Sequence, residues 1–280
     1  MSVDDSAKAW LEEAKILCQR LESYHHQSFA AFLKRKGKWR TDSVGGADWN
    51  NTLINKVRDQ VQPALDALNN DVRDAFRTEV ISKASELADD LEVTIRHIPG
   101  VSQDKTFKKF FDNFRNWKKE MVNVINNAVR HLQTDLLRLN NDSLNDGEKN
   151  PFTLRMLSVY GAVEKAKPPN GKGAKRTHQK MVLRTAICNL TSGPYPDTKQ
   201  YVRDNLDDIF EKAEERIVDG CNLILENIVH SFKKICAKGG NDNTLSSESR
   251  LLVGEKVKAA KKIMEGELQG HLQACGITLN

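Results

Sequence analysis

The chain has 280 residues, with 43 Lys or Arg against 38 Asp or Glu and a formal net charge of +5. Hydrophobic residues make up 39% of it, and it contains only 16 Gly and 7 Pro. This composition excludes a disordered chain, a collagen-like fibre and a small disulfide scaffold. It also disfavours an all-β sandwich, because such folds need frequent Gly and Pro turns.

The first predicted helix runs from Asp4 to about Lys34. Its apolar residues recur at steps of three and four, which is the period of one helical face. The acidic start and the basic end, followed by Gly37, are typical of helix termini. We therefore expect one uninterrupted helix here.

A loop over residues 37–48 and a second long helical pattern follow. Asp48 is expected to cap a helix that begins at Trp49. Pro63 lacks an amide donor, so the helix is expected to kink or restart there before continuing to Ile95.

A third helix is predicted over residues 104–139, with a broad aromatic stripe. Core packing explains most of that stripe, but Phe110 and Phe111 are adjacent, so one of them is a candidate for contact with a partner helix or subunit. A polar loop is expected at residues 140–147. A short helix then begins at Pro151 and ends near Lys165.

The rest of the chain is also helical by pattern. Helices are predicted over residues 175–190, 196–238 and 245–274, and we find no strand-like alternation of useful length. The fold class is therefore all-α, as an elongated bundle of long antiparallel helices. We expect an N-terminal region, 1–143, with three long helices, and a C-terminal region, 144–280, with a basic loop at 165–176, forming one continuous bundle.

Motifs for catalysis, cofactors and metals were sought and not found in the sequence. There is no G-x-x-x-x-G-K-[ST] or G-x-G-x-x-G loop, no H-E-x-x-H and no G-x-S-x-G. We therefore expect no enzymatic activity of the chain alone, no cofactor and no metal. Five unpaired cysteines, the lack of a secretory signal and the lack of an apolar run of about 18 residues predict an intracellular protein, nuclear or cytoplasmic.

Three basic segments are candidates for contact with phosphate groups or other anions. The first includes a tryptophan, the second (residues 105–119) interleaves Lys and Arg with aromatics, and the third lies in a Pro/Gly loop that exposes its charges. Ordinary solvation is the favoured explanation for the second segment. The candidate residues of the first and third segments are Lys34, Arg35, Lys36, Lys38, Arg40, Lys172, Lys175 and Arg176.

One short stretch carries a more specific signal. Residues 36–41 read KGKWRT, residues 44–46 read VGG and residues 48–53 read DWNNTL. Asp48 would cap the helix, Trp49 would anchor its first turn and Asn50 would satisfy amides of the loop. The residues that carry the pattern are Trp39, Thr41, Asp48, Trp49, Asn50 and Leu53.

This stretch resembles the helical region of fungal dynamin-like large GTPases, which are related to the vertebrate germinal-centre nuclear GTPase. In that family a GTPase domain precedes helices that resemble a stalk or effector bundle. The resemblance implies a fragment or truncated paralogue that lacks the GTPase domain. It transfers no nucleotide-binding residue to this chain.

Three functions remain open from the sequence. The first is a non-catalytic stalk or assembly module that contacts itself, a GTPase domain or a full-length relative. The second is a nucleic-acid-binding or nuclear module that uses the basic loops. The third is a peripheral membrane module that uses the same loops on anionic lipid.

Overall fold

The computed structural model describes residues 3–41, 45–98, 101, 105–145, 149–167, 174–189 and 191–238, with six residues between 251 and 262. It divides into two compact units. Unit 1 comprises residues 1–67 and 136–207, and unit 2 comprises residues 68–135 and 208–280. The boundary that we expected near residue 143 lies within unit 1.

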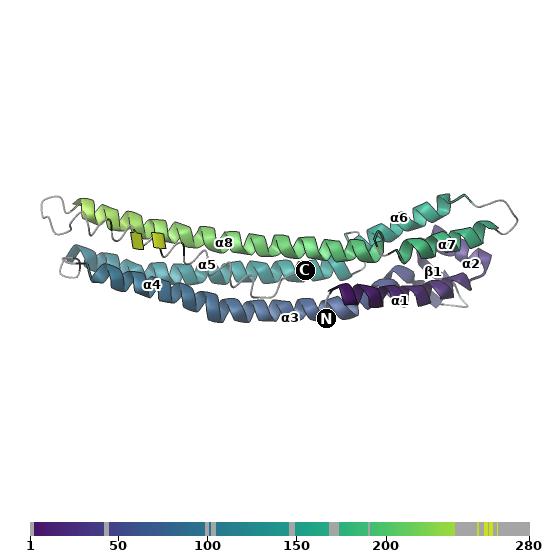
Figure 1. The fold of residues 1–280 in the computed structure, drawn as a ribbon, viewed down its shortest axis with the longest axis horizontal. Helices are drawn as coiled ribbons and strands as arrows, with labels where there is room; N and C mark the ends of the chain where they lie inside the picture. The colour runs from purple at the N-terminus through teal and green to yellow at the C-terminus, as the bar shows by residue number, and fades with distance from the viewer. Residues whose placement is uncertain are drawn as a thin grey trace. The chain divides into compact units, whose positions relative to one another are not determined.

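Unit 1 is made of helices and one small hairpin (Figure 1). Its elements are α1 (Val3–Glu22), α2 (His26–Lys34), β1 (Lys38–Thr41), β2 (Gly45–Asp48), the first part of α3 (Trp49–Ala75), the end of α5 (Lys105–Leu144), α6 (Pro151–Lys165), α7 (Ala174–Ile187) and the first part of α8 (Pro194–Lys238). Helix α7 packs against both α6 and α1.

Unit 2 consists of the remaining parts of α3, α5 and α8 together with η1 (Phe76–Val80) and α4 (Ile81–Arg96). The short π-helix η1 follows α3 directly and leads into α4. The expected all-α class is confirmed, with the β hairpin as a small addition.

The prediction of a single helix over residues 4–34 is wrong, because the helix is interrupted between Glu22, the last residue of α1, and His26, the first residue of α2. Ser23 and Tyr24 donate backbone hydrogen bonds to Arg20 and Leu21, which closes α1 with a tight turn. His25 then caps α2, since its Nδ1 accepts from the amide of Gln27 at 3.5 Å. Apolar periodicity continues across the break and therefore does not reveal it.

The expected loop over residues 37–48 contains a two-stranded antiparallel hairpin. Lys38 pairs with Asp48 and Thr41 pairs with Gly45. Each strand has four residues, and two of those in β2 are glycines. So short a strand shows no clear alternation of apolar and polar residues, and for this reason the sequence pattern did not predict it.

Helix α3 continues through Pro63 without restarting, and the helical path runs on through η1 and α4 to Arg96, close to the expected end at Ile95. Helix α5 is longer than the sequence predicted, because it extends to Leu144, into the segment 140–147 that we expected to form a polar loop. Arg58 donates from Nε to the carbonyl oxygen of Leu144 at 3.0 Å, and Leu144 itself is buried, so tertiary contacts favour the extra turn. The helix predicted at 245–274 lies outside the described residues, apart from the six noted above.

Each unit has its own hydrophobic core. In unit 1 the aromatic rings of Phe32, Trp49 and Tyr160 meet edge to face, with centroids 5.6–5.9 Å apart. In unit 2 Phe110 lies at the centre of a second aromatic cluster. Phe110 and Phe111 are both buried within this unit, so neither ring is left exposed on α5.

Candidate functional site

The turn between α2 and β1 contains the first residues of the KGKWRT stretch. Lys36 and Gly37 both have positive φ, at 54° and 86°. The amide of Gly37 donates to the carbonyl of Phe32 at 3.1 Å, which closes the C-terminus of α2. The carbonyl of Gly37 then accepts from the amide of Trp49 at 3.0 Å. The turn therefore holds the start of α3 against the end of α2.

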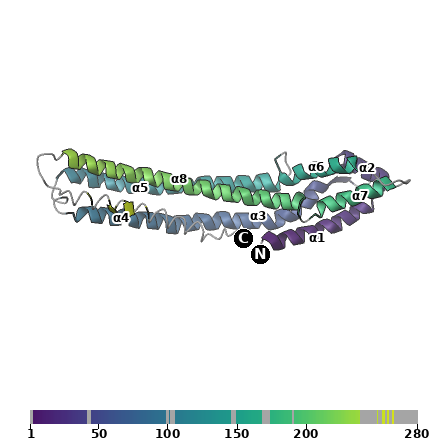
Figure 2. The same ribbon diagram turned by 45° about the horizontal axis from the view of Figure 1, so that its top comes forward.

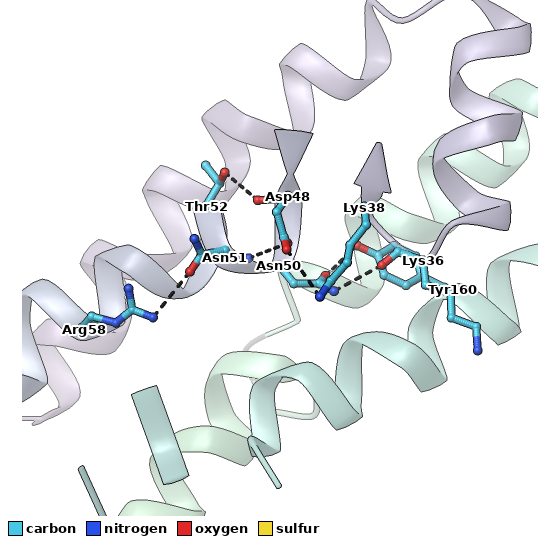
Figure 3. Close-up of polar contacts among 8 residues, drawn as sticks. All are labelled: Lys36, Lys38, Asp48, Asn50, Asn51, Thr52, Arg58 and Tyr160. Carbon is cyan, nitrogen blue, oxygen red and sulfur yellow. Dashed lines mark hydrogen bonds and ion pairs between the residues drawn. The ribbon is translucent and has the colours of Figure 1, made fainter. Parts of the chain in front are cut away.

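Asp48 sits at the start of α3 and joins it to the hairpin (Figure 3). Its Oδ1 accepts from the amide of Asn51 at 3.0 Å, as a helix cap does. Its backbone carbonyl accepts from the hydroxyl of Thr52 at 2.8 Å. Its other carboxylate oxygen lies 3.6 Å from Nζ of Lys38, which pairs with it across the two strands.

Asn50 is buried and links three elements (Figure 3). Its Nδ2 donates to the carbonyl of Lys36 at 3.2 Å, and its Oδ1 accepts from the hydroxyl of Tyr160 at 2.8 Å. The amide therefore bonds a loop carbonyl and not the loop amides that we expected. Burial raises the pKa of the Tyr160 phenol, and the carboxylate of Asp48 raises it further, so Tyr160 stays a neutral donor.

The apolar residues of the same stretch pack into the unit 1 core. Trp49 is buried against Tyr24 and Phe32, with ring centroids 6.1 and 5.9 Å away, and Leu53 is buried as well. Trp39, Arg40 and Thr41 form the backbone of β1, but their side chains lie outside the described residues. As described, the stretch joins α2, the hairpin, α3 and α6.

Sequence reasoning missed two residues of this network. Tyr160 lies 110 positions from Asn50, and Arg58 lies 86 positions from the Leu144 carbonyl that it binds. Arg58 also donates to Asn55 at 2.7 Å and to Asn51 at 3.4 Å. A tyrosine and an arginine on helical patterns carry no local signal of such contacts, because the partners are set by tertiary packing.

The first and third basic segments come to the same end of unit 1. Helix α2, the C-terminal end of α6 and the N-terminal end of α7 lie together there in both views (Figures 1 and 2). The Asn50–Tyr160 bond ties the α2 turn to α6, and Nζ of Lys180 in α7 donates to the carbonyl of Tyr24 at 2.7 Å. Segments about 130 residues apart in the sequence therefore lie at one end of unit 1.

We call this region the basic surface. Its cationic side chains are exposed, except that Arg176 is partly buried and donates to Gln179 at 2.7 Å. Lys38 pairs with Asp48 as described above. The side chains of Arg40 and Lys172, which we also expected to contribute, lie outside the described residues. The described residues of the basic surface are Lys34, Arg35, Lys36, Lys38, Lys165, Lys167, Lys175 and Arg176.

The second basic segment lies on α5 in unit 2. Lys118 there forms an ion pair with Asp89 of α4, with Nζ 2.6 Å from Oδ2. Lys108, Lys109, Arg115 and Lys119 are exposed. This segment belongs to a different unit and provides a natural control for the basic surface.

Among the residues that the structure describes, no group of three or more His, Cys, Asp or Glu is placed to hold a metal ion. Within the same residues, no helix combines the length and the apolar character that a membrane span requires.

Comparison with known protein families assigns the chain to one of them. A family model described as a domain of unknown function, DUF7605, matches residues 5–189, about two thirds of the chain. The chain belongs to the DUF7605 family. No curated protein and no solved structure matches it. The DUF7605 match includes the hairpin, the Asn50–Tyr160 network and all of the basic surface.

Proposed function

We propose that this DUF7605 chain is a non-catalytic helical module of a larger dynamin-like GTPase. The support is the resemblance of the KGKWRT and DWNNTL stretch to the helical region of such proteins. In this chain Asp48, Trp49 and Asn50 all bond or pack within unit 1. These residues stabilise the packing of α2, α3 and α6. Such a structural role is consistent with a helical region that supports the other domains of a larger protein.

We propose further that the module binds a phosphate backbone of nucleic acid through the basic surface. The observation that carries this function is the convergence of two basic segments, distant in sequence, at one end of unit 1. Clustered Lys and Arg neutralise successive phosphates and release condensed counterions, which makes such binding strongly dependent on salt. The exposed cationic side chains come from α2, β1, α6, α7 and the residues next to them, so neither segment alone supplies all of them.

Replacing Lys34, Lys36, Lys165 and Lys175 with Ala is expected to weaken binding to duplex DNA at low salt by about 100-fold or more. Each phosphate contact contributes about 0.9 to the slope of log K against log salt, so the slope should fall by about three to four. Fluorescence anisotropy with labelled duplex at several salt concentrations measures both quantities.

The matched control removes four charges from unit 2, with Lys108, Lys109, Arg115 and Lys119 replaced by Ala. Equal losses in the two variants would mean that net charge matters and the basic surface does not, which contradicts the proposal. Vesicles with and without phosphatidylserine form a second arm. Tighter binding to acidic vesicles than to DNA would favour the membrane alternative.

Self-association is a second candidate function, and helix α6 is the feature that favours it. Its inner face is buried in the unit 1 core, yet Leu154 and Leu157 on its outer side are 51% and 37% exposed. A helix that is apolar on both sides is normally covered on both sides. Because the dynamin-like resemblance implies assembly, the proposed cover is α6 of a second copy, in an isologous contact.

Replacing both Leu154 and Leu157 with Glu is expected to weaken dimerisation by about tenfold or more, since two negative charges from each copy would meet across the contact. Sedimentation at increasing protein concentration measures it. Leu223→Glu, at a 60% exposed position of α8, is the control and should leave the dimer unchanged. A wild-type chain that stays monomeric at all concentrations would exclude this function.

A further inference from the structure

Two of the five cysteines meet in the core of unit 1. Cys18 lies on α1 and is only 2% exposed, and Cys188 follows the last residue of α7 and is partly buried. Both pack in the same hydrophobic cluster. The two thiols are close enough for each to shift the pKa of the other. Residues 170 positions apart are thus neighbours in one core.

Contacts on either side hold the two cysteines in register. Toward the end of α1, Oε1 of Glu22 lies 3.1 Å from Nη1 of Arg184, and Nζ of Lys180 donates to the carbonyl of Glu22 at 2.7 Å. In the other direction, the rings of Trp10 and Tyr195 lie 6.4 Å apart. The two segments run antiparallel, and the Cys18–Cys188 pair falls between these contacts.

The backbone around Cys188 is also well supported. Its amide donates to the carbonyl of Arg184 at 2.9 Å, which continues the hydrogen bonding of α7 by one residue. Oδ1 of Asn189 then accepts from the amides of Thr191 and Ser192, at 2.9 and 3.2 Å. At Gly193 an added Cβ would lie 2.9 Å from the carbonyl oxygen of Ala186, so this turn is tightly packed.

The electrostatics divide the roles of the two thiols. The side-chain interaction with Cys18 lowers the pKa of Cys188 to about 7 against the effect of burial; Arg184 and Lys15 lower it too, while Glu12 opposes the shift. The same interaction, together with burial, raises the pKa of Cys18. Cys188 is therefore the thiolate, and Cys18 is the thiol that stays protonated. By contrast, burial alone raises the pKa of Cys221 in unit 2 to about 12.

We propose that Cys18 and Cys188 form a redox-active dithiol, in which a peroxide oxidises Cys188 and Cys18 then closes a disulfide between α1 and α7. The Cys188 thiolate attacks one oxygen of hydrogen peroxide, the O–O bond breaks, and a sulfenic acid and hydroxide form. Cys18 attacks the sulfenic sulfur, the S–S bond forms, and the S–O bond breaks. The Cys18 proton leaves with that oxygen as water. The hydroxide takes up the proton that Cys188 gave up when it ionised, so two thiols are oxidised and one peroxide is reduced to two waters.

Non-reducing peptide mapping of the full chain after treatment with one equivalent of hydrogen peroxide tests this modification site. The expected product is a linked pair of peptides containing Cys18 and Cys188, which dithiothreitol separates. Cys188→Ser should abolish the link, and Cys18→Ser should leave a Cys188 sulfenic acid that dimedone traps. Cys221→Ser is the matched control and should preserve the link.

Two outcomes would overturn the proposal: wild-type chain with both thiols still free after peroxide, or Cys188 sulfenic acid that accumulates in wild type as it does in Cys18→Ser.

A second measurement needs no substitution. Site-resolved alkylation by iodoacetamide should show Cys188 reacting with a midpoint near pH 7, because the thiolate is the nucleophile. At that pH it should react more than about 100-fold faster than Cys221, whose thiol is buried and protonated. The alkylation rate of Cys188 should therefore rise as the pH rises through 7. A midpoint near 9, or equal rates at the two cysteines, would contradict the assigned roles.

Discussion

Replacing Gly37 with Ala is expected to lower the free energy of unfolding by about 4 kcal/mol. Gly37 has φ of +86°, and an added Cβ would lie 2.4 Å from the Tyr160 hydroxyl oxygen and 3.1 Å from Oδ1 of Asn50. The unfavourable backbone costs about 1–3 kcal/mol. Separating the buried Asn50–Tyr160 pair leaves polar atoms without partners and costs about 1–3 kcal/mol more.

Gly46→Ala is the matched control for that substitution. Gly46 lies in the facing strand β2, and an added Cβ there meets no atom within 4 Å. It should change stability by less than about 0.5 kcal/mol. Urea unfolding gives the difference, and hydrogen exchange of peptides from α2 and the start of α3 locates it. A Gly37→Ala protein as stable as the control would mean that the turn does not require its left-handed conformation.

The contrast between these two glycines shows what sequence reasoning can and cannot supply. Both lie in a stretch rich in Gly, and composition alone marks both as turn residues. The positive φ of Gly37 and the positions of Asn50 and Tyr160 distinguish the glycine that must remain from the one that need not. That distinction depends in part on a contact across 110 residues.

The helices were predictable because each buries one continuous apolar face. The period of that face placed α6, α7 and α8 to within a few residues. It failed at the turn between α1 and α2, where His25 caps a new helix while the apolar pattern continues. It also failed at the end of α5, where Arg58 and the unit 1 core extend the helix through polar residues.

The basic surface was predictable only in parts. Local composition identified each basic segment, and the Pro/Gly content of the third indicated exposure. Their convergence depends on the α2 turn, on Tyr160 of α6 and on Lys180 of α7. The Cys18–Cys188 pair has the same origin, since neither cysteine has a neighbour in sequence that marks it as reactive.

Replacing Phe110 with Ala is expected to lower the free energy of unfolding by about 4–5 kcal/mol, the other large effect in the chain. Phe110 is 1% exposed at the centre of the unit 2 core. Its loss removes a buried ring and leaves a cavity that rigid helices cannot close. The rings that contact it, with centroids 5.4–6.2 Å away, are Phe107, Phe111, Phe114, Trp117 and Phe232.

Two further substitutions in unit 2 serve as comparisons, because the side chains that they remove are less buried than Phe110. Phe111 is 8% exposed, and the Arg96 guanidinium lies 3.9 Å from its ring centroid, so Phe111→Ala loses fewer ring contacts and should cost about 2–3 kcal/mol. Leu223→Ala, at an exposed position, should cost less than about 0.5 kcal/mol.

Urea unfolding followed by tryptophan fluorescence ranks the three variants. A larger loss of unfolding free energy in Phe111→Ala than in Phe110→Ala would contradict this expectation. It would mean that Phe111 is the central ring of the core and that α5 is rotated about its own axis.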